Sequence, residues 1–196
     1  MPYSADHKRQ TRARIVETAR ILFNRHGFHG VTIDMVMAEA GLTRGGFYNH
    51  FASKSELFDA AVASFLHGRG AQWRADAGVD LSQLSPDMAQ QMIAGYLSTN
   101  HLDDLDGQCP MIALPSDVAR AEGDVQKAYQ ELLGAMVWLF ERSLSANASA
   151  PEVRRKALAL AALCVGGMVL ARTLPESQLA QEVRAAAHDT AQAMAI

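Results

Sequence analysis

Residues 32–54 read TIDMVMAEAGLTRGGFYNHFASK, and they carry the clearest structural signal in the chain. Thr32 is a hydroxyl residue suited to cap a helix N-terminus. Apolar residues follow it at helical spacing, at Ile33, Val36, Met37 and Ala40. Gly41 then supplies the backbone freedom that a sharp turn between two helices requires. The stretch therefore predicts two short helices joined by a tight turn, with a further helix starting at its end.

The second helix of this pair is weak by itself. Thr43 is placed to cap it, but the helix is only about two turns long, which is marginal for an isolated helix. Gly45 and Gly46 each cost about 1 kcal/mol relative to alanine in a helix interior. Because intrinsic stability does not favour this sequence, another requirement accounts for it.

Binding to DNA is that requirement in our interpretation. A helix-turn-helix unit places its second helix in the major groove, where glycines near the N-terminus let the backbone approach closely. Arg44 is placed to donate a bidentate pair to O6 and N7 of guanine, or else it contacts a phosphate or is solvated. Tyr48, His50 and Lys54 carry donors of the kind that contact phosphates. In the alternative for His50, its side chain caps or packs beneath the turn.

The stretch resembles the DNA-binding domain of the tetracycline-repressor (TetR) family. The agreements at fixed spacing are Thr32, Ile33, Ala40, Gly41, Leu42, Thr43, Gly45, Phe47, Tyr48, His50, Phe51, Ser53 and Lys54. Met37 departs from the pattern, because the family usually has a small alanine there; methionine is pliable enough to pack, with a slightly different angle between the helices. The resemblance implies DNA contacts from Thr32, Thr43, Arg44, Gly45, Tyr48, Asn49, His50 and Lys54.

The distribution of charge agrees with a DNA-binding end. The 196-residue chain has a net charge of −3, which by itself does not suggest a partner for nucleic acid. Residues 1–54 hold eight Lys and Arg against four acids, which is +4, and the other 142 residues hold ten against seventeen, which is −7. A basic end on an acidic body is the charge pattern of a DNA-reading domain joined to a different domain.

No feature of the sequence predicts a metal, a cofactor or a membrane span. Cys109 and Cys164 lie far apart and outside any spacing typical of zinc ligands or of a disulfide framework. The most apolar run, residues 158–170, is shorter than a membrane-spanning helix, and no signal peptide is recognisable. We therefore expect a soluble, cytoplasmic protein.

Residues 1–52 are predicted to form a three-helix DNA-binding domain. An apolar stripe between about Lys8 and Arg25 marks a first helix that packs behind the reading pair, and Gly27 ends it. The stripe consists of Ile15, Val16, Ala19, Leu22 and Phe23. Arg12 and Arg14 either contact phosphates or form a solvated basic face.

Residues 53–196 are predicted to form an all-α ligand-binding and dimerisation domain. Ser53 and Glu56 fit a capping box, so a fourth helix starts at Ser53 and is the one obvious mechanical link between the domains. Ser85 with Pro86 starts a helix that runs to about His101. Further helices are expected at about 112–121, 124–145, 151–174 and 176–195, and no strand pattern is present.

The last two helices are predicted to form the dimer interface. The helix that Pro151 opens is apolar nearly all round after Lys156, and such a helix must be covered on all sides. Small residues along it let backbones approach closely, namely Ala159, Ala162, Gly166 and Gly167. We expect residues 151–195 to form an antiparallel pair that docks against its copy as a four-helix bundle, as the resemblance also implies.

Methionines and aromatic residues of the second domain are candidates for a ligand cavity, because such side chains make adaptable apolar pockets. The candidates are Phe65, Met92, Tyr96, Cys109, Met111, Met136 and Trp138, and Met88 is of the same kind. Any one of them is also an ordinary core residue. Cys109 resembles the position where some regulators sense oxidants or electrophiles, but the nearby aspartates would raise its pKa, which favours a structural thiol.

The sequence is thus interpreted as a homodimeric regulator of transcription, most simply a repressor that a small apolar or aromatic molecule releases from a pseudo-palindromic operator. Two other classes stay open. An enzyme would need convergent catalytic groups, and the second domain offers no recognisable acid–base pair or nucleophile motif. A nucleoid-type architectural protein would need a basic body, and this body is acidic.

Overall fold

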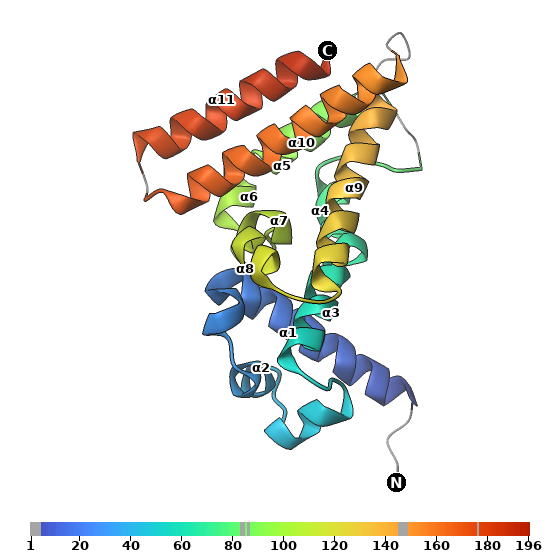
Figure 1. Ribbon diagram of the computed structural model, residues 1–196, viewed down its shortest axis with the longest axis vertical. Coiled ribbons are helices and arrows are strands. Elements are labelled where there is room, and N and C mark those ends of the chain that lie inside the picture. The colour runs from blue at the N-terminus through green and yellow to red at the C-terminus, as the bar shows by residue number, and fades with distance from the viewer. Residues whose placement is uncertain (1–4, 83–84, 86, 145–148, 176) are drawn as a thin grey trace.

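The computed structural model describes residues 5–82, 85, 87–144, 149–175 and 177–196. Within these ranges the regular elements are eleven α-helices and one 3-10 helix, without a strand, so the predicted all-α fold class is confirmed. Figure 1 shows α1 and α2 at one end of the molecule and the α10–α11 pair at the other, with α3 and α9 running between them. Pro86 and Glu176, each predicted at the start of a helix, lie outside the described residues.

The N-terminal unit is built around the buried stripe of its first helix. Helix α1 spans Ala5–Gly30, and its stripe residues Ile15, Ala19 and Phe23 are fully buried. The predicted end at Gly27 is a break: its φ of 68° and ψ of 173° interrupt the helix before a last short turn. Helix α2 spans Ile33–Glu39, and Thr32 caps it by accepting a hydrogen bond from the amide of Met35 at 3.1 Å.

The second helix of the predicted helix-turn-helix differs from the prediction in two respects. Element η1, Arg44–Asn49, is a 3-10 helix, and the Thr43 side chain makes no capping hydrogen bond. The bonds run from Gly46 N to Thr43 O at 3.0 Å and from His50 N to Phe47 O at 2.9 Å. A short segment with two glycines has little tendency to hold the longer α-helical bonds, so the tighter 3-10 form is a reasonable outcome.

The helix that connects the two units begins where the sequence predicts. Helix α3 spans Lys54–His67, and Ser53 Oγ accepts from the amide of Glu56 at 3.1 Å. Glu56 reaches back to the amide of Ala52 at 2.6 Å, one residue before the cap, so the capping box is a close variant of the standard one. Helix α4, Arg69–Asp76, follows after a change of direction at Gly68.

In the middle of the chain, two of the predicted helices are each replaced by two shorter helices. The helix expected up to His101 is α5, Met88–Tyr96, followed by α6, Thr99–Asp103, because Ser98 is extended and caps α6 instead of continuing α5. The helix expected at 112–121 is α7, Pro110–Ala113, and α8, Pro115–Arg120. A proline disfavours α-helical backbone in the residue before it, which explains the break at Leu114. Helix α9 spans Val125–Ser143.

The last two helices are an antiparallel pair, α10 (Ala150–Thr173) and α11 (Gln178–Ala195), and α10 also packs on α9. By length and composition alone α10 could cross a membrane, with a mean hydropathy of 1.5, but the core helix of a soluble protein passes the same test. Gly167 of α10 faces α11: a β-carbon there would lie 2.6 Å from Cβ of Ala187. The close approach predicted for Gly167 therefore occurs within one chain.

We predict that Gly167→Ala destabilises the fold by about 1–3 kcal/mol, because the added methyl group overpacks the contact between α10 and α11. Urea unfolding followed by circular dichroism at fixed protein concentration measures the change. Gly134→Ala in α9 is the matched control, since nothing lies within 4 Å of the position that its β-carbon would take, and it should gain about 0.5–1 kcal/mol. Equal effects of the two substitutions would contradict the packing assignment.

Candidate functional site

The outer surface of η1 brings together most of the predicted DNA contacts. Thr43, Arg44, Gly45, Tyr48 and Asn49 are all exposed, and the Tyr48 side chain is 59% exposed. Phe47 and Phe51 hold this surface from behind, as both are buried.

The two glycines of η1 have different surroundings. Gly45 has open space where a side chain would be, whereas a β-carbon at Gly46 would lie 3.6 Å from the terminal methyl of Met37. Met37 is 1% exposed, so the methionine that departs from the family pattern packs inside the helix pair.

Arg44 lies at the front of this surface in an ion pair. Its Nη1 is 2.5 Å from Oδ2 of Asp34 on α2, and both side chains are more than half exposed. Exposed pairs of this kind contribute little to stability. The guanidinium is therefore held near the α2–η1 edge by a partner that it can leave at small cost.

Lys54 and His50 lie in surroundings that differ from those of exposed phosphate donors. The Lys54 ammonium donates to the carbonyls of Phe28 and Val31, each at 2.9 Å, and lies 4.2 Å from the centre of the Phe28 ring. Burial lowers the pKa of Lys54. This lysine joins the start of α3 to the end of α1, and its phosphate contact stays a prediction.

His50 is partly buried, and its Nδ1 is buried without a hydrogen-bond partner. Burial lowers its pKa, and the charges of Lys8 and Arg12 lower it further, which favours the neutral ring. The alternative in which His50 packs beneath the turn therefore fits better than a cationic phosphate contact. Lys8 and Thr11 of α1 line a hollow next to η1 together with His50, a proximity that the sequence pattern did not indicate.

The second domain contains a cavity of about 230 Å³. All seven predicted ligand residues line it, which are Phe65, Met92, Tyr96, Cys109, Met111, Met136 and Trp138. Met88 is buried but is not among the lining residues. Residues that the sequence interpretation did not select also contribute, most notably Trp73, Arg74 and His101. Of these three, Trp73 could have been predicted from the sequence, because it is an aromatic residue like several of the chosen candidates.

Cys109 does not have the properties of a reactive thiol. It is 3% exposed, and burial raises its pKa to about 11, so the protonated thiol dominates at neutral pH. Reactive thiolates need a lowered pKa and access to solvent. These surroundings favour the structural interpretation. Cys164 is also buried, with a pKa raised to about 12. Within the described residues no group of His, Cys, Asp and Glu could hold a metal ion.

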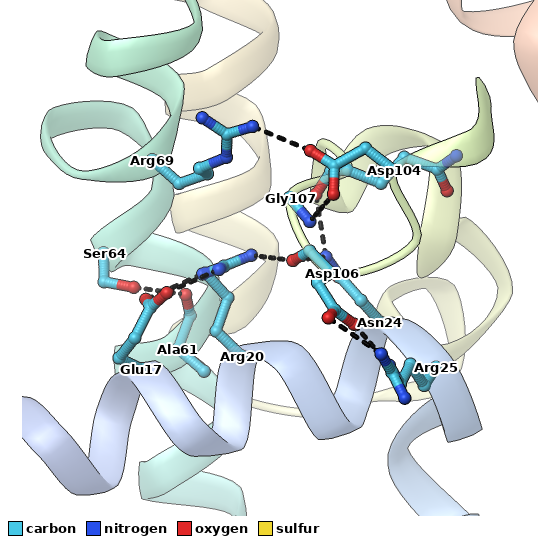
Figure 2. A network of polar contacts seen from close by, with 11 residues as sticks. Glu17, Arg20, Asn24, Arg25, Ala61, Ser64, Arg69, Asp104, Asp106 and Gly107 are labelled. Atoms are coloured by element: carbon cyan, nitrogen blue, oxygen red, sulfur yellow. Dashed lines mark hydrogen bonds and ion pairs between the residues drawn. The ribbon is translucent and has the colours of Figure 1, made fainter. Parts of the chain in front are cut away.

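A polar network joins α1 to the loop between α6 and α7, as Figure 2 shows. Arg20 donates to both carboxylate oxygens of Glu17 and to the carbonyl of Asp106 at 2.5 Å. Arg25 pairs with the Asp106 carboxylate, and Asn24 donates to the carbonyl of Gln108 at 2.8 Å. Helix α3 is therefore not the one mechanical link between the units: this loop is a second.

The loop is also tied to the wall of the cavity. The Gln108 amide donates to the carbonyl of His101 at 3.2 Å and to that of Leu102 at 2.9 Å. Two neighbours of Gln108 line the cavity: His101, whose carbonyl accepts its hydrogen bond, and Cys109, the next residue in the chain. The loop between α6 and α7 therefore contacts both α1 and the wall of the cavity.

Comparison with known proteins shows which family the N-terminal unit matches. Residues 15–61 match the family model described as bacterial regulatory proteins, tetR family. An uncharacterized HTH-type transcriptional regulator TtgW of Pseudomonas putida is 34% identical over 79 residues, which cover 40% of this chain and 59% of that protein. The HTH-type transcriptional regulator SrpR, also of Pseudomonas putida, is 34% identical over 79 residues, 40% of this chain and 37% of its own length.

The matched part therefore spans less than two thirds of these relatives. A solved structure, a putative TetR-family transcriptional regulator from Rhodococcus sp., has a TM-score of 0.71 at 15% identity and covers 96% of this chain and 100% of that one. At this identity the likeness concerns the fold, from the helix-turn-helix to the last helices. Residues 15–61 therefore carry the region that characterises the tetR family of bacterial regulatory proteins, and the chain as a whole has the fold of a TetR-family regulator.

Proposed function

We propose that this protein is a sequence-specific DNA-binding regulator of transcription, with residues 1–52 as the reading domain and residues 53–196 as the ligand-binding and dimerisation domain. The observation that carries the proposal is the exposed surface of η1, where Arg44, Tyr48 and Asn49 project from a short, glycine-containing helix. Arginine reads guanine in the major groove, and tyrosine and asparagine side chains contact phosphates. The +4 charge of residues 1–54 supports the same partner.

An unpartnered apolar face on α10 and α11 supports a homodimer. Leu158 and Leu170 of α10 are 45% and 55% exposed, and Leu179 of α11 is 56% exposed. The small residues Ala162 and Gly166 lie between the two leucines of α10, on exposed or half-buried positions. Docking of this face against its copy would bury these side chains and present two reading domains. Such a dimer binds two half-sites separated by about 34–36 Å or a multiple.

Regulation by a small molecule follows from the position of the cavity. Phe65, Leu66 and His67 at the end of α3 line it, and the start of α3 adjoins η1. A ligand that displaces the end of α3 or the loop at 104–108 would change the position of the reading domain. In this proposal the displacement removes Arg44 and Tyr48 from the operator, so the protein is a repressor that the ligand releases. To change the ratio of the two arrangements from 1:99 to 99:1, the ligand must bind one of them about 5.5 kcal/mol more tightly than the other.

An enzymatic function of the same cavity is less well supported. Three lining residues are of a type suited to acid–base or nucleophilic work near neutral pH, namely His67, His101 and Cys109. His67 is exposed, whereas the other two are buried: burial lowers the pKa of His101 and raises that of Cys109. Neither shift favours the protonated imidazole or the thiolate. We therefore assign the cavity to an effector.

Selection of bound fragments from random or genomic DNA by the purified protein tests the proposal. Enrichment of an inverted repeat is the expected result. Binding that depends on salt but enriches no sequence would overturn the sequence-specific regulator in favour of an architectural protein.

We predict that Arg44→Ala weakens operator binding by about 1–3 kcal/mol and relaxes the preference at one base pair, because a bidentate contact to guanine is lost. Titration of the selected operator and of its single-base variants measures both effects. Arg154→Ala is the matched control: the side chains of Arg44 and Arg154 are 63% and 56% exposed, each is in an ion pair, and Arg154 lies on α10, at the opposite end of the molecule from α2 (Figure 1). Unchanged preference in Arg44→Ala would remove Arg44 from the base-reading set.

We predict that Leu170→Glu converts the dimer to a monomer, because a carboxylate would be buried without a partner at the interface. Sedimentation velocity measures the association. Leu158→Glu should act in the same direction, whereas Met35→Glu, at a 38% exposed position on α2 at the opposite end of the molecule (Figure 1), should leave the dimer intact. A dimer that persists in both α10 variants would contradict the proposed interface.

A further inference from the structure

The cavity of the second domain has a polar end. Arg74, Tyr96, His101 and Cys109 all line it. The centres of the Tyr96 and His101 rings are 4.9 Å apart, and the ring of Trp73, the residue before Arg74, is 5.8 Å and 5.0 Å from them. The two polar rings therefore lie side by side on a wall to which Arg74 and Cys109 also contribute. The remaining wall is mainly apolar, with three methionines, two tryptophans, Phe65, Leu132 and Leu139 among its residues.

Arg74 brings an unneutralised positive charge to this end. It is half-buried and donates to the carbonyl of Leu66 at 2.9 Å, and among the described residues it makes no ion pair. Arg69, at the start of the same helix, instead pairs with Asp104 at 2.7 Å. The cavity wall contains no aspartate or glutamate within the described part of the chain. A guanidinium in such surroundings favours an anion.

Two more polar groups at this end lack partners. Tyr96 Oη and His101 Nε2 are buried without a hydrogen-bond partner, and the two residues are 2% and 3% exposed. The carbonyl of Tyr96 can only accept, so His101 Nδ1 carries the proton in that bond. A buried polar group without a partner is destabilising, and a ligand that offers one is favoured. A carboxylate can accept from the Tyr96 hydroxyl, whereas His101 Nε2, which without a proton can only accept, would need a donor from the ligand.

We propose that the effector is a compact apolar or aromatic carboxylate, with its carboxylate bound by Arg74 and Tyr96 and its hydrocarbon part among the methionines and tryptophans. The inference rests on the proposed regulatory function of the cavity and narrows the class of molecule. The planar guanidinium fork matches both oxygens of a carboxylate, and the Tyr96 hydroxyl can donate to the same group. A neutral ligand would fill the apolar part but leave Arg74 without a counter-ion.

Paired probes test the proposal, with 4-phenylbutanoate as the carboxylate and 4-phenylbutanamide as its neutral analogue. Both tryptophans of the chain, Trp73 and Trp138, line the cavity, so quenching of tryptophan emission excited at long wavelength reports occupancy, and calorimetry gives the affinity independently. We expect the carboxylate to bind at least about tenfold more tightly than the amide, as a charged hydrogen-bond pair in a partly buried site would give.

Substitutions of Arg74 then assign the preference. Arg74→Gln should reduce the carboxylate to the affinity of the amide, and Arg74→Lys, which keeps the charge, should retain a preference for the carboxylate. Arg155→Gln is the control, because it removes the same charge from an exposed position near the start of α10. The melting temperature of each variant shows whether it is folded.

The outcomes separate this inference from the proposed function. Equal affinity of the two probes for the unaltered protein, or binding of neither at millimolar concentration, overturns the carboxylate class. A preference that survives in Arg74→Gln overturns the assignment to Arg74. If the same protein still selects an inverted repeat from DNA, only the class of effector has failed; if it selects none, the proposed function has failed as well.

Discussion

The relative position of the two units depends on one buried charge. Arg20 of α1 is 3% exposed, and its guanidinium is satisfied by the Glu17 carboxylate and by the carbonyl of Asp106, which is 86 residues away in sequence. A buried arginine without such partners would be strongly destabilising, so the loop that carries Asp106 must stay against α1 for the charge to remain buried. Asn24 and Arg25 extend the same contact along the helix (Figure 2).

This constraint gives the cavity two connections to the reading domain. One runs along α3, whose last turn lines the cavity and whose first turn is tied to the end of α1 by Lys54. The other runs through Gln108, which bonds to the carbonyl of His101 and lies beside Cys109. A ligand shifts such a system only if it binds two arrangements with different affinity. Because the polar end of the cavity and the Asp106 loop are neighbours, a bound group that reorients His101 or Cys109 acts directly on the contacts with α1.

Much of the fold was predictable from local signals. Thr32 and Ser53 cap the helices that follow them, Gly41 adopts the positive φ that the turn requires, and the stripe of α1 is the buried one. The predicted cavity residues line a common cavity because methionines and aromatics on the inner faces of several helices leave irregular space between them. The errors in the predicted helices also have local causes. Ser98 caps a new helix where one continuous helix was expected, Pro115 interrupts another, and η1 takes the 3-10 form in place of an α-helix.

Caps, turns and apolar periodicity act over a few residues, so they were sufficient to predict the helix-turn-helix, most of the helices in their order and, as an expectation, a division into two domains. The partners of individual charged side chains became known only from the packing of the folded chain. Lys54 looks like a phosphate donor but donates to two carbonyls of the preceding segment, and Arg69 and Arg74 on one short helix differ completely, one paired with Asp104 and the other facing the cavity without an acid. The physical reason is that the partner of a charged side chain is set by which distant segment packs against it, and this information is absent from local spacing.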